Sequence, residues 1–382
     1  MKNSVLFSVG VPLPGAGMGN HAYYLVQGLF RHHLLKQALV LQYHDIDDAL
    51  SEHIRTFYLA ERIAYRLTRY IHTDQYVLRD NLFDAWVSRY VKDAAVFYGW
   101  THHALWSLKA AKRQKMMTVL ERANSHPLTY SRLLDEEYTR RGIRKAAYHP
   151  LILKKHLREL KETDYIAVTS QFTKDSLLEH GIDEQRILLT PLGVNTDYFI
   201  PRNMSQGESI FRVVYVGQIC VRKGIHYLLE AWDKLQLHNA ELLLVGDLVS
   251  EMTETVTQVC KKNDSVRVLP HTADPRSLYQ AASVCILPTL EDGFGLVVLE
   301  AMACGVPVIV TEHTGAKDCV RPECDGFVIP PYDVKSIADM LSYCHTHRSQ
   351  LQTMGIQARQ QAEQFSWTHY QDGIVRQLQQ LL

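Results

Sequence analysis

Residues 291–311, EDGFGLVVLEAMACGVPVIVT, decide the fold that we expect. Two acidic residues precede a Gly-Phe-Gly turn, and small and aliphatic residues then form a helical segment that stops at Gly305. Pro307 follows, and residues 308–310 form an apolar run of strand length. The order loop, helix, turn and buried strand is typical of one unit of a parallel α/β sheet.

The acidic residues of this stretch are predicted to line a ligand site. Asp292 lies at the helix entrance, and Glu300 lies eight residues later, within the helix. A helix entrance offers free backbone N–H groups and the positive end of the helix dipole, which suit a phosphate. A carboxylate inside the helix suits the hydroxyl groups of a sugar.

The same alternation of apolar strands and helical patterns runs through the whole chain. In the first half we expect strands at residues 4–9, 38–42, 94–98, 117–120, 165–169 and 187–190, and helices at 21–31, 53–69, 104–115 and 171–180. In the second half we expect strands at 211–216, 240–245, 266–269 and 284–287, and helices at 227–235, 256–263, 277–282 and 366–382. Two such series predict an α/β fold of two doubly wound, Rossmann-like parallel sheets facing a central cleft.

A length of 382 residues favours two domains, and a polar gap indicates where they divide. Gly, Pro, Asn, Ser and Gln gather at residues 201–209, just before the second series of strands. We place the boundary there, with domains at 1–205 and 206–365 and a helical tail at 366–382. Ligands in such folds bind at the carboxyl ends of the strands, so we expect the site in the cleft.

The composition is that of a globular protein, with 46% hydrophobic and 21% charged residues. Apolar runs fall short of the ~18–20 residues that span a bilayer, and the N-terminus is expected to form a strand rather than a signal peptide. Seven scattered cysteines without a CxxC pair favour reduced thiols and a cytoplasmic location. The spacing of His and Cys predicts no zinc site, and the acidic segment at residues 45–48 is expected to be a solvated loop, so we expect neither metal nor cofactor.

The net charge is zero, but the charge is unevenly spread. Residues 1–200 carry 26 Lys and Arg against 21 Asp and Glu, a balance of +5, which leaves −5 for residues 201–382. A mildly basic half suits an anionic acceptor or an anionic membrane surface, and equally a set of solvated helix faces. Residues 105–117, LWSLKAAKRQKMM, fit either an interfacial helix or a buried helix with a wet face. We expect no nucleic acid partner.

A glycine-rich loop, GAGMGN at residues 15–20, follows the first expected strand. It lacks the third glycine of the dinucleotide fingerprint, because Asn20 stands there, and it lacks the Lys of a P-loop. Gly17 and Gly19 would still let the backbone approach a ligand closely at a helix N-terminus. A plain connecting loop is the alternative.

A second loop, VGQICVRKG at residues 216–224, follows the first strand of the second series. Arg222 and Lys223 stand side by side just before a helix, where a diphosphate would meet two cations. A solvated surface pair is the alternative. Because the acidic stretch lies at the same edge of the same expected sheet, the ligand-binding interpretation is favoured.

Polar residues also follow two expected strands of the first half, where they are expected to face the cleft. Glu121 and Arg122 begin the segment ERANSH, which ends at His126, and His102 follows another strand in the same way. We expect Glu121, Arg122 and His102 on the acceptor side and His126 as a catalytic candidate. In a chain with 19 histidines, a structural role is the commoner one for any single histidine.

Together these segments resemble the retaining glycosyltransferases of family 4, the glycosyl transferases group 1, which have the GT-B fold. The resemblance rests on the glycine-rich loop after the first strand, Gly193-Val194-Asn195, the loop at 216–224 and the stretch at 291–311. It implies that Glu300 holds the ribose hydroxyls of a sugar nucleotide and that Lys223 binds the diphosphate.

The resemblance also implies a donor site built mainly on the second domain. Asp292, with Glu291 as an alternative, stands where the family's first Glu contacts the donor sugar. Gln218 replaces an Arg that is common in the family, and Arg222 is expected to supply that cation. The tail is implied to cross back onto the first domain. The remaining donor contacts are assigned to Gly17, Gly19, Gly217, Gln218, Arg222, Gly293, Phe294, Gly295 and Leu296.

The implied activity is a metal-independent, retaining transfer of a hexose from a UDP or GDP sugar to a hydroxyl acceptor. The implied acceptor is a glycan or a lipid-linked sugar, as in polysaccharide, glycolipid or other glycan synthesis, in the cytoplasm or at the inner face of the membrane. The catalytic candidates are Lys223, Arg222, Asp292 and His126. The alternative is a catalytically degenerate nucleotide-sugar-binding protein, which Asp292 and Gln218 would favour.

Overall fold

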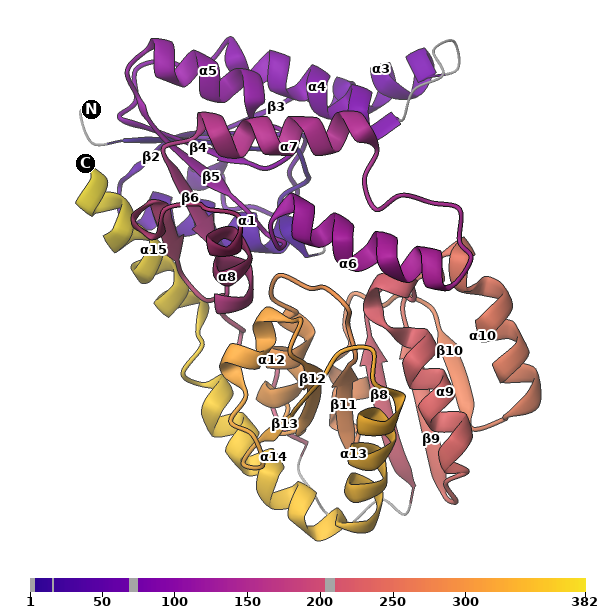
Figure 1. The fold of residues 1–382 in the computed structure, drawn as a ribbon. Helices are drawn as coiled ribbons and strands as arrows, with labels where there is room; N and C mark the ends of the chain where they lie inside the picture. The colour runs from indigo at the N-terminus through magenta and orange to yellow at the C-terminus, as the bar shows by residue number, and fades with distance from the viewer. Residues whose placement is uncertain (1–3, 16, 69–74, 203–209) are drawn as a thin grey trace.

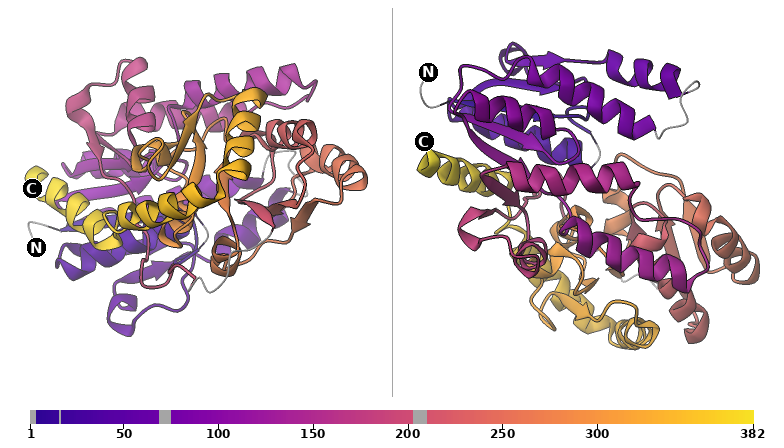
Figure 2. Two further views of the ribbon diagram at one scale, coloured as in Figure 1. Left: turned by 90° about the horizontal axis from the view of Figure 1, so that it is seen from below. Right: turned by 45° about the horizontal axis from the view of Figure 1, so that its top comes forward.

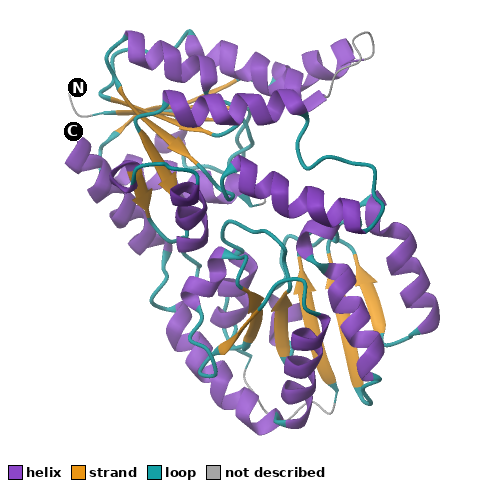
Figure 3. Ribbon diagram, viewed as in Figure 1, coloured by secondary structure: helices purple, strands orange, loops and turns teal. Residues whose placement is uncertain are grey.

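The computed structural model describes residues 4–15, 17–68, 75–202 and 210–382. Within these ranges the chain forms two parallel β-sheets, each covered by helices (Figures 1 and 3). The first sheet has seven strands in the order β3-β2-β1-β4-β5-β6-β7, and the second has six in the order β10-β9-β8-β11-β12-β13. The predicted fold class, two doubly wound Rossmann-like units, is confirmed.

Strands and helices alternate along the chain in both halves. The first sheet contains β1 Val5–Val9, β2 Leu35–Val40, β3 Ile54–Thr56, β4 Val96–Trp100, β5 Met117–Glu121, β6 Tyr165–Val168 and β7 Ile187–Leu189. The helices of this half are α1 Met18–Arg31, α2 Asp48–Ser51, α3 Leu59–Thr68, α4 Gln75–Ser88, α5 Leu105–Arg113, α6 Pro127–Arg140, α7 Pro150–Glu162, α8 Gln171–Glu179 and the 3-10 helix η1 Glu184–Arg186.

The second half repeats this alternation. Its strands are β8 Phe211–Val216, β9 Ala240–Val245, β10 Val266–Leu269, β11 Val284–Leu287, β12 Val308–Thr311 and β13 Gly326–Ile329. Its helices are α9 Ile225–Leu235, α10 Ser250–Lys262, α11 Arg276–Gln280, α12 Leu296–Ala303, α13 Val334–Thr346, α14 Arg348–Ala362 and α15 Trp367–Leu381, with the 3-10 helices η2 Val221–Lys223 and η3 Gly315–Cys319.

Both faces of the first sheet are buried, which explains its apolar strands. On β1, Val5, Phe7 and Val9 pack in one hydrophobic cluster together with residues of α1. Leu6 belongs to a second cluster, together with residues of α4 and α5. Because successive side chains of a strand point to opposite faces, a strand buried on both faces is a nearly continuous apolar run.

The last helix returns to the first domain, as Figures 1 and 2 show in yellow. α15 packs along α1, where the ring of Trp367 stacks on that of Tyr24 with centroids 4.0 Å apart. The Tyr370 hydroxyl lies 2.6 Å from His21 Nε2. The domain boundary predicted at residue 205 lies outside the described residues, and the sheets change between β7 and β8.

The structure corrects one predicted helix. Residues 53–69 are expected as a single helix, of which residue 69 lies outside the described part. Ile54–Thr56 instead form the edge strand β3, which pairs in parallel with β2, and α3 begins only at Leu59. Ile54 and Thr56 are β-branched and meet an edge of β2 that offers backbone partners, so pairing there overrides the helical spacing of the segment.

The helix within residues 105–117 has a buried apolar face. Leu105, Leu108 and Ala111 of α5 are buried, whereas Trp106 remains 47% exposed. The structure therefore supports the interpretation of α5 as a buried helix with a wet face. Among the helices of the described ranges, none is both long and apolar enough to cross a membrane.

Candidate active site

Two adjacent cations stand at the carboxyl end of β8. After β8 the chain turns at Gly217, passes through η2 and enters α9 at Gly224. Gly224 has a φ of +67°, and a Cβ there would lie 1.9 Å from the carbonyl oxygen of Pro288. Only glycine allows so close an approach to the segment after β11. Arg222 and Lys223 are thereby held at the sheet edge where a diphosphate was predicted to bind.

The acidic turn after β11 meets these cations. Lys223 Nζ forms an ion pair with Asp292 Oδ2, and both side chains are largely buried. Arg222 Nη1 donates a hydrogen bond to the carbonyl oxygen of Glu291 at 2.7 Å. Burial opposes ionisation of Asp292, but the charges of Lys223 and Arg222 outweigh it and hold the pKa of this carboxyl below its usual value. The structure thus brings the two predicted loops together as an ionised cluster.

Helix α12 begins directly after this turn. Gly295 precedes it with a φ of +85°, and the Thr314 hydroxyl donates to the carbonyl oxygen of Phe294 at 3.0 Å. Glu300 lies within the helix and accepts a hydrogen bond from the Tyr279 hydroxyl of α11 at 3.0 Å. Burial raises the pKa of Glu300 to about 7. The carboxylate is therefore held in place but is only partly ionised at neutral pH.

Three other predicted donor residues, Gln218, Phe294 and Leu296, range from exposed to buried. The side chain of Gln218 is exposed. The main-chain carbonyl oxygen of Gln218 accepts a hydrogen bond from the Tyr215 hydroxyl at 2.7 Å. Phe294 is buried in the core, so only its main chain is available to a ligand. Leu296 starts α12 and is half-buried. Their contacts with a donor stay predictions.

The glycine-rich loop is tightly folded at the start of α1. Gly17 precedes the helix with a φ of +56°, and a Cβ on Gly19 would lie 2.5 Å from the carbonyl oxygen of Pro12. Ala16, just before Gly17, lies outside the described residues. Packing and backbone conformation alone require glycine at both positions, and their contact with a donor stays a prediction.

Glu121 and Arg122 are buried and bound by neighbouring groups, and their acceptor-side role stays a prediction. Glu121 is 1% exposed, accepts a hydrogen bond from the Tyr98 hydroxyl of β4, and has its pKa raised to about 8 by burial. Arg122 is 2% exposed, and its Nε donates to the carbonyl oxygens of Asn124 at 3.1 Å and Ser125 at 2.9 Å. Polar groups at a strand end turn inward where neighbouring segments satisfy them, as happens here.

His126, the catalytic candidate, caps helix α6. Its Nδ1 accepts a hydrogen bond from the Leu128 amide at 3.3 Å, and its ring stacks on that of His180 with centroids 3.9 Å apart. Burial and the nearby His180 lower the pKa of His126 to about 3, so the ring is neutral. Capping accounts for these contacts, and a catalytic role stays a prediction.

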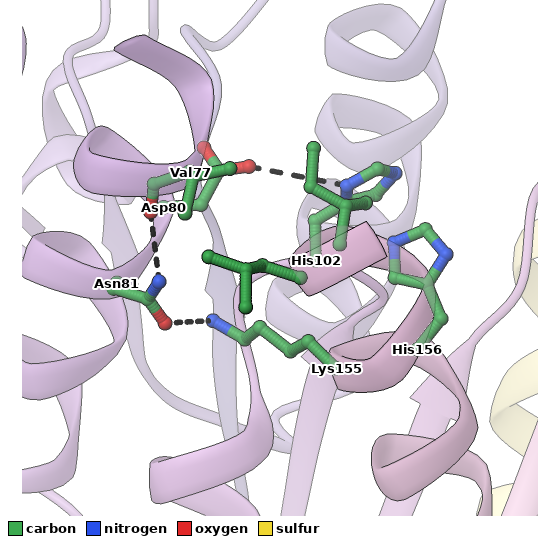
Figure 4. Close-up of a pocket in the computed structure, with 8 residues that line it drawn as sticks. Val77, Asp80, Asn81, His102, Lys155 and His156 are labelled. Atoms are coloured by element: carbon green, nitrogen blue, oxygen red, sulfur yellow. Dashed lines mark hydrogen bonds and ion pairs between the residues drawn. The ribbon is translucent and has the colours of Figure 1, made fainter. Parts of the chain in front are cut away.

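His102, the third acceptor-side candidate, lines a pocket in the first domain (Figure 4). Its amide donates to the Glu159 carboxylate at 2.9 Å, and its ring packs edge-on against that of His156 with centroids 4.0 Å apart. Lys155 Nζ, also on the wall, donates to Asn81 Oδ1 at 3.1 Å. The lining residues come from α4, the loop after β4 and the start of α7, and they are Val77, Asp80, Asn81, His102, Leu151, Ile152, Lys155 and His156.

Known structures share the whole fold. Sucrose-phosphate synthase from Thermosynechococcus elongatus matches with a TM-score of 0.72 and 19% identity over 100% of this chain and 99% of that one. HepE from Anabaena in complex with UDP-glucose matches with a TM-score of 0.69 and 17% identity over 99% of both chains. Residues 210–347 match the family model described as glycosyl transferases group 1. The chain has the GT-B fold, and its residues 210–347 are similar to glycosyl transferases group 1.

Curated relatives that are similar to this chain are also described as glycosyltransferases. The capsular polysaccharide biosynthesis glycosyltransferase CapM of Staphylococcus aureus is 29% identical over 246 residues, which cover 59% of this chain and 65% of CapM. The chain spans less than two thirds of the length of the first curated relatives that it matches. The resemblance to GT-B glycosyltransferases is confirmed, whereas membership of family 4 and retention of configuration stay predictions.

The second domain meets the first through Ser170 and Gln171, two residues that the sequence did not single out. Ser170 Oγ donates to the carbonyl oxygen of Gly293 at 2.6 Å, and the Gln171 amide donates to Asp318 Oδ2 at 2.6 Å. A Ser before a predicted helix indicates an N-cap, but no local signal indicates a contact across domains. In the ranges that the structure describes, no group of three or more His, Cys, Asp or Glu could hold a metal ion.

Proposed function

We propose that this protein is a metal-independent, retaining glycosyltransferase that moves a hexose from a UDP or GDP sugar to a hydroxyl acceptor. The proposed setting is the synthesis of a polysaccharide, glycolipid or other glycan in the cytoplasm or at the inner face of the membrane. The match of residues 210–347 to glycosyl transferases group 1 supports the reaction class. The similarity to CapM, a glycosyltransferase of capsular polysaccharide biosynthesis, supports a polysaccharide setting.

The observation that carries the proposal is the meeting of Arg222 and Lys223 with Asp292 at the carboxyl edge of the second sheet. Two cations beside a helix entrance suit a diphosphate, which leaves with its negative charge when the sugar is transferred. Asp292, held ionised by those cations, is placed to contact the hydroxyls of the donor sugar. A bound diphosphate would then share Lys223 with Asp292.

The proposed catalysis is mainly electrostatic and positional. The sugar becomes oxocarbenium-like as its bond to the diphosphate lengthens, and Lys223 and Arg222 stabilise the charge that develops on the leaving oxygen. The leaving diphosphate itself takes the proton of the acceptor hydroxyl as that oxygen bonds to the anomeric carbon, so no protein side chain has to act as the general base. Closure of the two domains excludes water, which limits hydrolysis of the donor.

We assign the nucleoside end of the donor to Glu300. Its carboxylate accepts from the Tyr279 hydroxyl, which orients it, and it retains acceptor capacity for the ribose hydroxyls. Because burial raises the pKa of Glu300 to about 7, donor affinity should rise as the pH rises through 7. HepE, of the same fold, is described in complex with UDP-glucose, which supports a uridine nucleotide as the first donor to test.

We place the acceptor against the first domain, near the pocket lined by His102. The pocket is only large enough for a water molecule, so a sugar would lie at its mouth, where His, Asp, Asn and Lys groups offer hydrogen-bond partners. The basic balance of residues 1–200 supports contact with an anionic membrane. Co-sedimentation with phosphatidylglycerol vesicles, but not with phosphatidylcholine vesicles, would support this contact, and equal sedimentation would exclude it.

Incubation with radiolabelled UDP-glucose, UDP-galactose and GDP-mannose, with and without cell-envelope extract, tests the reaction. We expect one donor to be consumed, label to pass to an acceptor in the extract, and EDTA to leave the rate unchanged. NMR of the product's anomeric centre reads out retention. Binding of a sugar nucleotide without hydrolysis or transfer of any donor would instead establish the non-catalytic alternative.

A further inference from the structure

Among the described residues, the hydrogen bonds to the carboxylate of Glu291 come from the first domain. Glu291 belongs to the acidic turn of the second domain, yet its side chain is fully buried. Its Oε1 accepts hydrogen bonds from the Ser125 amide and the Ser125 hydroxyl, both at 2.9 Å, and its Oε2 accepts from Asn124 Nδ2 at 3.1 Å. A buried carboxylate is tolerated only with such partners, so this contact depends on the two domains being closed.

The same residue also positions a donor cation. Arg222 Nη1 donates to the Glu291 carbonyl oxygen at 2.7 Å and lies 3.7 Å from its carboxylate Oε2. The next residue, Asp292, holds Lys223. Two consecutive residues therefore connect the loop after β5 with the two cations of the proposed diphosphate site: Glu291 contacts Arg222, and Asp292 contacts Lys223.

The first-domain side of this contact is itself firmly held. Arg122 clamps the loop from inside the first domain by donating to the carbonyl oxygens of Asn124 and Ser125. On the other side, a Cβ on Gly293 would lie 1.7 Å from the carbonyl oxygen of Ala123, so the two loops are in direct backbone contact. Such a rigid support means that closure allows essentially one position for the Glu291 carboxylate.

We propose that Glu291 is a positioning residue that couples domain closure to the alignment of Arg222 for the leaving diphosphate. Closure seats the carboxylate on Ser125 and Asn124, and the seated main chain fixes the guanidinium. When the domains separate, the carboxylate becomes solvated and Arg222 loses this alignment. The inference rests on the proposed function for its catalytic consequence, whereas the contact itself is independent of any substrate.

Hydrogen–deuterium exchange of the full chain without ligand tests the contact. In the Glu291→Ala variant we expect the peptide that contains Ser125 to exchange about tenfold faster or more, because the amide loses a charged acceptor. Glu291→Gln retains one acceptor oxygen and should lie between this variant and the wild type. Glu254→Gln, an exposed glutamate of α10 in the same domain, is the matched control. Unchanged exchange at Ser125 in Glu291→Ala would overturn the proposal.

Kinetics with whichever donor the radiolabel screen identifies tests the consequence. We expect Glu291→Ala to lower kcat for transfer about tenfold or more, while the share of donor lost to water rises, because the open site admits water. If Glu291 had only a structural role, its substitution would lower the amount of active enzyme without changing the share of donor that is hydrolysed. If Glu291→Ala does not fold, Ser125→Ala weakens the same contact from the other side and should show the same direction of change. If the share of donor lost to hydrolysis is unchanged in a folded variant, the coupling is refuted. If no donor is turned over in the screen, the proposed function is wrong, and the hydrogen–deuterium exchange result alone decides whether the contact exists.

Discussion

Replacing Lys223 by Ala is the sharpest test of the donor site. Its ammonium is paired with Asp292, with only 12% and 15% of the two side chains exposed, so the charge acts in a partly dry environment. Removing one such donor from a developing anion typically costs about 2–4 kcal/mol of transition-state stabilisation. We therefore expect kcat/KM for transfer to fall about 30- to 1,000-fold.

The substitution also leaves Asp292 with one cation fewer, which must be separated from the catalytic effect. Lys223 and Arg222 hold the pKa of Asp292 low against the effect of burial, so in Lys223→Ala this pKa should rise and the fold should lose about 1–3 kcal/mol. Adding Asp292→Asn removes the unpaired charge. The double variant should recover part of the stability but not kcat/KM, provided that the cation acts on the diphosphate.

The assay is initial-rate transfer at saturating acceptor, with urea unfolding of each variant in parallel. Lys234 offers a matched control, because it pairs with Glu230 on the outer face of α9 with 62% and 55% of the side chains exposed. Lys234→Ala should change stability by less than about 1 kcal/mol and leave the rate alone. If Lys223→Ala retained kcat/KM within about threefold of wild type, the assignment of this cation to the leaving group would be wrong.

Three further outcomes follow from other parts of the fold. Burial raises the pKa of Glu121 from 4.5 to about 8, so the folded state keeps a proton that the unfolded chain releases, and the free energy of unfolding should fall as the pH rises from 5 to 9. Glu121→Gln should make that slope shallower in urea titrations, and equal slopes would contradict the assignment. Gly293→Ala, whose Cβ would meet the carbonyl oxygen of Ala123 at 1.7 Å, should force the domains apart, raise the radius of gyration in small-angle scattering and abolish transfer. Trp367→Ala should cost about 3–5 kcal/mol and expose the C-terminal helix to limited proteolysis, whereas resistance like that of wild type would show that α15 needs no stacked ring.

Four strands of the second domain could be predicted to the residue, whereas β12 ends one residue later than expected and β13 has no predicted counterpart. β8, β9, β10 and β11 have the expected bounds. A parallel strand buried on both faces is a continuous apolar run, and polar or glycine residues end it sharply.

Helices α6 and α7 escaped prediction although each carries a start signal. His126 and His149 cap them through Nδ1, and a proline occupies the first turn of both. Proline at this position favours a helix start, but the expected cap is Ser, Thr, Asp or Asn, so a His-Pro pair is a weak signal.

The donor side of the site was predictable because it depends on local order. Arg222 and Lys223 follow β8 and Asp292 follows β11, and neighbouring parallel strands bring their carboxyl ends to the same edge. The inward orientation of Glu121 was not predictable, because it depends on Tyr98 of the adjacent strand. Hydrogen-bond partners such as Tyr98 come from tertiary packing, and no periodic pattern in the sequence indicates them.

The division of roles between Glu291 and Asp292 depends on the same kind of partner. Adjacent side chains of an extended segment leave the chain on opposite sides, so only one of these acids can face Lys223. Ser125, 166 residues earlier in the chain, donates two hydrogen bonds to the carboxylate of Glu291. The Glu291 side chain therefore points toward the first domain. Asp292, whose side chain is one methylene shorter, forms the ion pair with Lys223. In this arrangement Glu291 is bound to the first domain and Asp292 is the acid that faces Lys223, so we expect Asp292 rather than Glu291 to contact the donor sugar.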